Sequence, residues 1–106
     1  MLVTTTNDLP GYRVIETLGL VRGIIVRSSS ALGDLSASIQ SVFGGNITAY
    51  IKVAEQARRR AYDAMVDHAN KMGANAVIGA RYDSTDITDG MTEVLAYGTA
   101  VVVEKI

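Results

Sequence analysis

The spacing of apolar residues along the chain predicts where the first strands lie. Residues 2–6 are rich in Val and Thr and predict a short strand, which a turn over residues 7–11 ends. Residues 12–27 form a nearly continuous apolar run, which is typical of a strand buried on both faces. Gly19 and Gly23 interrupt this run, and they indicate a bulge or the close approach of another backbone.

A helical spacing dominates the middle of the chain. Gly73 suits the position just after the end of this helix, Asn46 suits its N-cap, and His68 fills a gap in its apolar stripe. Residues 32–42 show a weaker pattern, which predicts a short or irregular helix. The main stripe recurs at steps of three or four residues and comprises Ile47, Tyr50, Ala54, Ala57, Ala61, Met65 and Met72.

The last third of the chain predicts a β-hairpin. Residues 76–82 and 94–103 are apolar and read as strands, and Asp89-Gly90 between them is a strong signal for a two-residue hairpin loop. The whole pattern therefore predicts an α+β fold of the β-α-β-β type, with an antiparallel sheet and one long helix.

The predicted hairpin has two apolar faces. A two-residue loop pairs Tyr82 with Tyr97 on one face, and it places small residues such as Gly98 on the other. One helix can cover only one of these faces. We therefore expect the small-residue face to meet another subunit, in an assembly whose isolated subunit is not the stable form.

Composition narrows the class of protein. The 106 residues make one domain, 1–106, and 48% apolar with 20% charged residues excludes a disordered chain. The net charge of −1 offers no field for nucleic acid, and the absence of cysteine removes disulfides and thiolate chemistry. No apolar run reaches the ~20 residues that span a membrane, and no signal peptide precedes the domain, so we expect a cytoplasmic protein without a membrane partner.

Five short segments occur together in a pattern that resembles the YbjQ-like family of bacterial proteins. Heavy-metal binding has been proposed for this family, and no activity has been established for it. The resemblance implies a subunit similar to the dodecin type, assembled with copies of itself into a ring, a pentamer. The chain departs from the family pattern at Ile24 and Arg81, where it lacks acidic residues. The matching segments are Val3-Thr4-Thr5, residues 19–23, Gly44-Gly45 with Tyr50, residues 73–77 and residues 98–101.

Candidate metal ligands are few. Carboxylates of the 83–93 hairpin could bind a hard cation, although their spacing is not that of an EF-hand loop. Asp86 faces Glu93 in the predicted pairing, and this like-charge pair implies a cation, a basic partner or a longer loop. His68 could add a nitrogen ligand but more often packs as a hydrogen-bonded residue. The full candidate set is Asp83, Asp86, Asp89, Glu93 and His68.

The other candidate residues are basic and aromatic. The run Arg58-Arg59-Arg60 could hold an anion, or it could form a charged helix face or a subunit contact. We find no motif for a catalytic residue or a cofactor, so an enzyme such as a hydrolase is the least favoured class. The sequence favours a homo-oligomeric protein that binds a metal ion, or a module that carries or stores small molecules. The pockets of this module would lie at subunit interfaces and be lined by Tyr50, Tyr62, Tyr82 or Tyr97.

Overall fold

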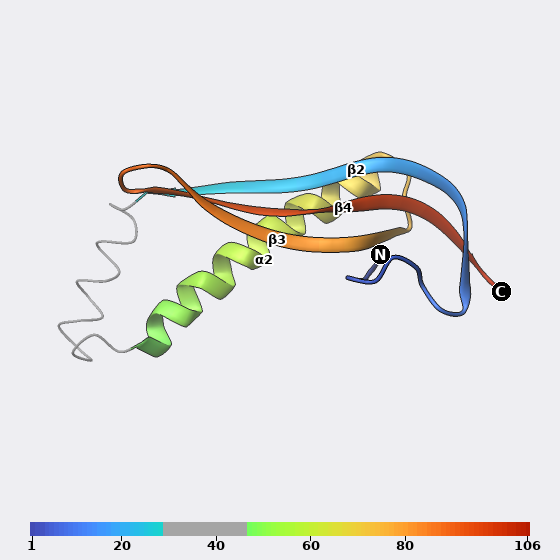
Figure 1. The fold of residues 1–106 in the computed structure, drawn as a ribbon, viewed down its shortest axis with the longest axis horizontal. Helices are drawn as coiled ribbons and strands as arrows, with labels where there is room; N and C mark the ends of the chain where they lie inside the picture. Colours follow the sequence, from blue (N-terminus) through green and yellow to red (C-terminus); the bar gives the residue numbers. More distant parts are fainter. Residues whose placement is uncertain (29–46) are drawn as a thin grey trace.

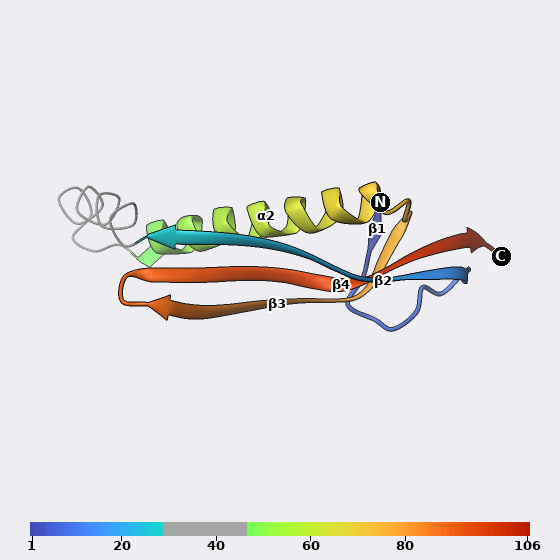
Figure 2. The ribbon, with the colours of Figure 1, turned by 90° about the horizontal axis from the view of Figure 1, so that it is seen from above.

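The computed structural model of the chain describes residues 1–28 and 47–106. One helix, α2 (Ile47–Lys71), lies along one face of a four-stranded sheet (Figures 1 and 2). The predicted helix over 32–42 and the N-cap at Asn46 lie outside the described residues. The strands are β1 (Leu2–Val3), β2 (Tyr12–Ser28), β3 (Ala76–Thr88) and β4 (Met91–Lys105), in the spatial order β1-β3-β4-β2.

The sheet is mixed, whereas an antiparallel sheet was predicted. The pairs β2–β4 and β3–β4 are antiparallel, but β1 runs parallel to β3. The predicted strand over 2–6 is reduced to Leu2–Val3, and the backbone beyond it still bonds to β3. The Thr4 amide donates to the Val77 carbonyl at 3.0 Å, and the Gly79 amide donates to the Thr6 carbonyl at 2.7 Å. The short N-terminal segment therefore covers the outer edge of β3 and leaves β2 as the other edge.

The helix ends where the sequence predicts. Gly73 has a φ of +89°, a left-handed conformation that glycine adopts without steric cost. The Ala74 amide donates to the Ala69 carbonyl at 3.0 Å, and the Gly73 amide donates to the Asn70 carbonyl at 3.0 Å. These two bonds form a Schellman motif, which satisfies carbonyl groups that the helix end leaves free. The motif turns the chain directly into β3.

The alanine stripe of α2 packs closely on the sheet, as its small side chains predict. Ala57, Ala61 and Met65 are at most 4% exposed. The strand beneath contributes Gly23, whose missing side chain leaves room for the helix backbone at Ala61. Outside this centre the stripe is less buried, because Ala54 is exposed and the inward position after Met65 belongs to Ala69.

The helix covers the small-residue face of the hairpin, which corrects the expectation that this face meets another subunit. Val94, Ala96 and Ala100 of β4 join the buried cluster under α2. The physical reason is the fit of the surfaces, because small side chains let the helix axis approach the sheet. Within residues 1–28 and 47–106, no helix lies on the opposite side of the sheet (Figure 2). We call it the open face, and its residues include Leu20, Ile24, Val26, Leu95 and Tyr97.

The open face is only partly covered within the chain. At one end, Leu9 and Tyr12 pack on Val101 and Val103, after the loop from β1 crosses to this side (Figure 2). Elsewhere β2 is exposed, with Leu20 64% accessible. The prediction that 12–27 is buried on both faces is therefore wrong for the single chain. The reason is that α2 covers only the face of β2 that carries Val21, and the face that carries Leu20, Ile24 and Val26 stays exposed.

The Asp89-Gly90 loop forms as predicted, but the register beyond it differs. Thr88 pairs with Met91, and then Ile87 is left out of the ladder, so that Asp86 pairs with Thr92. Asp89 has a negative φ, so the turn is not of type I′, the geometry that matches the twist of the paired strands. A bulge in the β3–β4 ladder compensates for the difference. A slip of one residue turns every following side chain to the other face.

Candidate ligand-binding cleft

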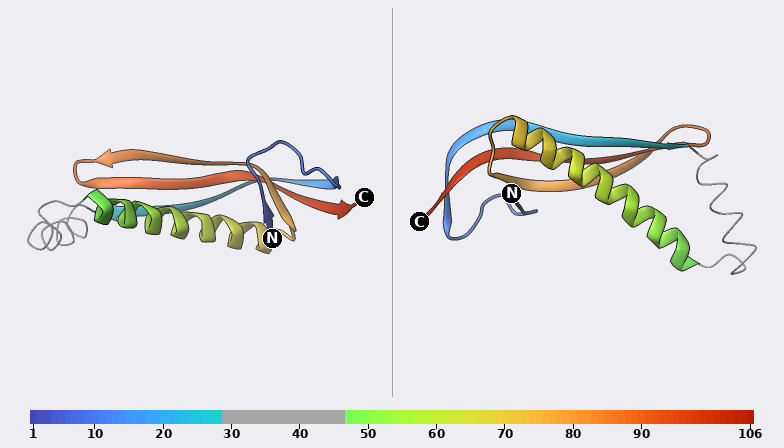
Figure 3. Two further views of the ribbon diagram at one scale, coloured as in Figure 1. Left: turned by 90° about the horizontal axis from the view of Figure 1, so that it is seen from below. Right: turned by 180° about the vertical axis from the view of Figure 1, so that it is seen from behind.

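A cleft of about 360 Å³ lies between the middle of α2 and β3. Four of its residues come from the helix and one from the strand: Glu55, Arg58, Arg59, Tyr62 and Tyr82. The cleft exists because α2 crosses the sheet obliquely, as the rear view in Figure 3 shows. The N-terminal half of the helix therefore lies outward of β3. Long side chains, rather than alanines, occupy the space between the helix and this strand.

Each arginine of the cleft stacks on a tyrosine. The Arg58 guanidinium carbon lies 5.6 Å from the centre of the Tyr82 ring, and that of Arg59 lies 5.6 Å from the Tyr62 ring. Both distances fall within the range of a cation–π contact. Arg59 also lies 4.0 Å from the Asp63 carboxylate, at the edge of ion-pair distance. A guanidinium group in such a contact keeps N–H donors that can bind an anion.

The register shift at Ile87 creates this arrangement. Tyr82 pairs with Ala96, not with Tyr97 as predicted, and so turns toward the helix. Tyr97 instead pairs with Arg81 and lies on the open face. In the sequence, the arginine run and Tyr82 are separate candidates. Their contact could not be predicted, because the bulge that brings them together has no glycine or proline signal at Ile87.

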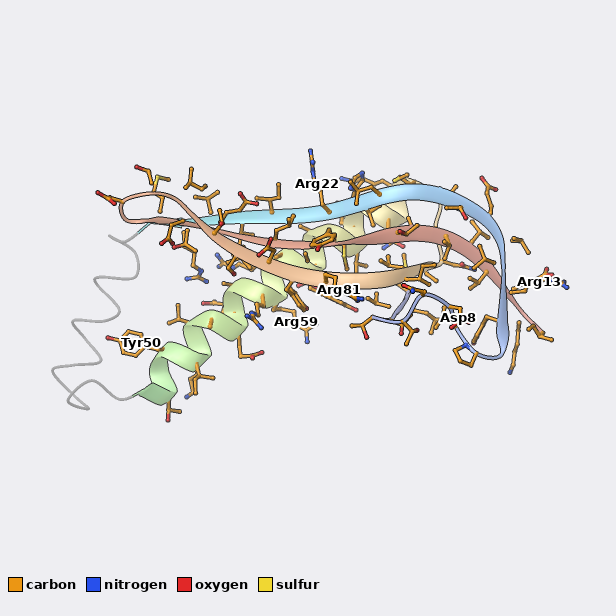
Figure 4. The ribbon with its side chains drawn as sticks, in the orientation of Figure 1. Asp8, Arg13, Arg22, Tyr50, Arg59 and Arg81 are labelled. Atoms are coloured by element: carbon orange, nitrogen blue, oxygen red, sulfur yellow. The ribbon has the colours of Figure 1, made fainter. Side chains whose placement is uncertain are left out.

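A smaller hollow of about 170 Å³ adjoins the cleft. Tyr62 and Tyr82 belong to both, so these two side chains form the shared wall. The inner lining is mostly apolar and includes Val3, Met65 and Ala96. The Arg81 side chain donates 2.8 Å hydrogen bonds to the Thr5 and Ala80 carbonyls, and thereby holds the N-terminal segment against this hollow. Figure 4 shows Arg59 and Arg81 on neighbouring elements.

The remaining predicted tyrosines line separate hollows. Tyr50 lines one of about 280 Å³ under the start of α2, together with Arg27. The Arg27 Nε is buried without a hydrogen-bond partner, and no pattern in the sequence points to this residue. Tyr97 lines a hollow of about 330 Å³ on the open face with Arg22, Asp83 and two leucines. The four tyrosines therefore lie at three separate places, and only Tyr62 and Tyr82 lie at the same one.

The five candidate metal ligands are dispersed. Asp86 accepts a 3.1 Å hydrogen bond from the Thr92 hydroxyl, and its predicted like-charge opposition to Glu93 does not occur because of the bulge. Asp83 accepts a 2.9 Å bond from the Ser84 amide, and Asp89 lies in the hairpin loop. Within residues 1–28 and 47–106, no three His, Cys, Asp or Glu side chains gather as a metal would require.

His68 has a structural contact at the edge of the sheet. Its Nδ1 accepts a 3.3 Å hydrogen bond from the Arg22 backbone amide, and the side chain is exposed rather than turned inward. Arg22 belongs to the edge strand β2 (Figure 4), and its backbone amide bonds to His68 rather than to β4. His68 therefore satisfies a free edge donor, and this contact is a local reason for a histidine at this helix position.

We expect no tight binding of a soft heavy metal by the described residues. Such ions prefer thiolate ligands, and the chain has no cysteine. Isothermal titration calorimetry with zinc and with cadmium, on protein purified without a histidine tag, should give weak heats without defined stoichiometry. A stoichiometric site of sub-micromolar affinity would contradict this, and a His68→Ala variant would then show whether the histidine takes part.

The fold and the cleft define a small α+β domain in which one helix covers a mixed sheet and leaves an arginine- and tyrosine-lined cleft at its side. The chain belongs to the YbjQ-like family, whose model, described as "Putative heavy-metal-binding", matches residues 1–104. A UPF0145 protein of Burkholderia mallei (strain SAVP1) is 56% identical over 100 residues, which cover 94% of this chain and 90% of that protein. A UPF0145 protein of Burkholderia pseudomallei (strain 668) matches with the same identity and coverage.

A solved structure shares the fold. The crystal structure of a DUF74-family protein of unknown function from Pediococcus pentosaceus superposes with a TM-score of 0.64. The two chains are 17% identical, and the match covers 98% of each. This likeness supports the arrangement of helix and sheet in the described residues. Among the helices of the described residues, none has the length and apolarity needed to cross a bilayer.

Proposed function

We propose that this protein is a self-associating binding protein for a small ligand, and that the ligand occupies the cleft between α2 and β3. The observation that carries the proposal is the pair of stacked Arg–Tyr contacts at the cleft, Arg58 on Tyr82 and Arg59 on Tyr62. Stacking limits the freedom of four long side chains before a ligand arrives. A site that is ordered in advance loses less entropy on binding.

The open face supports self-association. Leu20 is 64%, Ile24 47% and Val26 48% exposed on one continuous side of β2. Exposed apolar side chains gathered on one face in this way are typical of a contact surface. Arg22 and Asp83 lie on the same face with opposite charges, so a second copy could pair each with its counterpart. We propose that the contact is part of the closed ring, a pentamer, that the family resemblance implies.

Sedimentation velocity at low micromolar concentration tests the assembly. We expect a species several times the subunit mass of 11.3 kDa. Ile24→Asp places a charge on the open face and should shift the sedimentation to smaller species. Ile51→Asp is the matched control, because Ile51 is 56% exposed on α2, away from the open face. A wild-type monomer, or equal effects of the two variants, would contradict the proposal.

A fragment screen followed by protein-observed NMR tests the ligand site. Neutral, cationic and anionic fragments are added to the isotope-labelled protein, and amide signals are followed. We expect the fragments that bind to shift signals of residues 58–62 and 80–83 before others. If no fragment shifts these residues, or if all shifts fall at Tyr50 or Tyr97, the cleft is not the ligand site.

Metal-ion binding is the second candidate function. The family description favours it. Because the candidate ligands of one chain are dispersed, a metal site would have to combine carboxylates such as Asp83 and Glu93 from different subunits. The calorimetric titration described above decides between the two functions when it is carried out on the assembled protein.

A further inference from the structure

The charges of the cleft define the polarity of its ligand. Arg58 and Arg59 contribute two positive charges to the lining, and Glu55 contributes one negative charge. Asp63 lies outside the lining, 4.0 Å from Arg59, and offsets part of the charge of that arginine, so Arg58 is the main anion-binding group of the cleft. Guanidinium groups cannot be deprotonated at physiological pH and bind oxyanions with a planar fork of donors. The guanidinium carbon of Arg58 lies 5.6 Å from the centre of the Tyr82 ring, and a guanidinium group in such a contact can still direct its N–H donors to an anion.

The adjoining hollow defines the body of the ligand. It lies behind Tyr62 and Tyr82, has a volume of about 170 Å³ and is lined mainly by apolar side chains. An inorganic anion would contact the arginines and leave this hollow empty. A ligand that carries a flat apolar group can place that group against the tyrosine rings and its acidic group at Arg58 and Arg59.

We infer that the cleft binds a small organic oxyanion, with a phosphate or carboxylate group on an aromatic or similarly flat apolar body. This inference rests on the proposed function and specifies the ligand class of that same site. A polymeric anion such as RNA is disfavoured, because net charge is −1 and a long backbone needs an extended basic surface. The two arginines are confined to one turn of helix.

Three probes separate the two parts of the ligand: phenyl phosphate, phenol and inorganic phosphate. Titrations are followed by NMR at residues 58–62 and 80–83 in the assembled wild-type protein. We expect phenyl phosphate to bind at least about tenfold more tightly than either fragment, because only it engages both the arginines and the apolar hollow. Arg58→Gln should remove this advantage over phenol, and Tyr82→Leu should remove the advantage over inorganic phosphate.

Arg60→Gln is the matched control. It removes the same charge from the next position of the same helix, and Arg60 does not line the cleft. This variant should bind phenyl phosphate with nearly wild-type affinity. Circular dichroism of each variant confirms that the fold is retained, which is expected because Arg58 and Tyr82 are exposed.

The possible outcomes distinguish this inference from the proposed function. If phenol binds as tightly as phenyl phosphate, the anion requirement is wrong and the cleft remains a ligand site. If inorganic phosphate binds as tightly as phenyl phosphate, the flat body is wrong. If Arg58→Gln and Arg60→Gln lower the affinity for phenyl phosphate equally, the effect comes from the overall charge of the helix and not from the cleft. This result overturns the inference. If none of the probes and no fragment of the screen affects the cleft, both proposals fail.

Discussion

Replacing Gly23 with alanine is expected to lower the free energy of unfolding by about 3 kcal/mol, or roughly 15 °C in Tm. A β-carbon at this position would overlap the Ala61 carbonyl and the Met65 amide of α2 and would lie 2.8 Å from the Ala64 β-carbon. Two of these obstacles are backbone atoms, which cannot rotate away. The helix must therefore lift from β2, and the buried contacts of Ala57 and Ala61 loosen with it.

Thermal unfolding followed by circular dichroism measures this effect. Thr17→Ala serves as the control, because Thr17 is an exposed residue of the same strand and its loss should change stability by less than about 0.5 kcal/mol. If Gly23→Ala melts within a few degrees of the wild type, the helix does not rest on this glycine. Such a result would contradict the close contact between α2 and β2.

The substitution Gly98→Glu is expected to unfold the subunit rather than only separate subunits. A β-carbon here would lie 2.6 Å from a Val77 methyl group and 3.1 Å from the Ile78 carbonyl oxygen. Ala96 and Ala100, on the same side of β4, are buried in the cluster under α2. A carboxylate buried there without a partner costs several kcal/mol. Added to the steric overlap, this approaches the whole stability of a small domain, about 5–15 kcal/mol.

Thr99→Glu gives the comparison for Gly98→Glu. Thr99 is the next residue, and its side chain lies on the open face opposite Leu20. We expect Thr99→Glu to keep the wild-type circular dichroism spectrum while it weakens self-association in sedimentation. Gly98→Glu should lose the spectrum, become sensitive to protease or aggregate. A folded but monomeric Gly98→Glu protein would instead place the small-residue face at a subunit contact.

Local signals predicted most of the secondary structure. The periodicity of α2 and the glycine after its end gave the helix to within one residue, because both are properties of consecutive residues. The Asp89-Gly90 pair located the hairpin loop for the same reason. Gly19 and Gly23 were interpreted correctly as well. A register shift lies between Thr17 and Gly19, and the helix backbone approaches Gly23.

The arrangement across the sheet could not be predicted in the same way. Two shifts in the β3–β4 ladder, between Asp86 and Thr88 and between Ile78 and Arg81, reassign which side chains share a face. Such bulges depend on the geometry of the turn and on the twist of the strands. Counting residues outward from the hairpin loop predicts neither of these. The alanines of α2 and the small residues of β4 could have predicted which face the helix covers, because two surfaces of small side chains can pack closely together. The small residues of β4 were instead predicted to form a subunit contact.

For the candidate site, the sequence supplied the residues but not their combination. The arginine run and the tyrosines were visible as separate features, and the alternative of a charged helix face was open. The Arg58–Tyr82 contact required the position of β3 against α2, which is a long-range property of the fold. Arg27 carried no signal, because its significance lies only in the burial of its Nε.

The order of the strands also bears on how the chain reaches its native state. β3 and β4 are joined by a two-residue loop and can pair early, whereas β2 comes from the other end of the chain and pairs with β4 along its whole length, from Tyr12 opposite Lys105 to Ser28 opposite Met91. Closing so long a loop is slow, and such topologies refold in milliseconds to seconds rather than microseconds. Before β2 pairs with it, β4 exposes an unpaired apolar edge to which other chains can bind. Refolding should therefore give more native protein at low chain concentration.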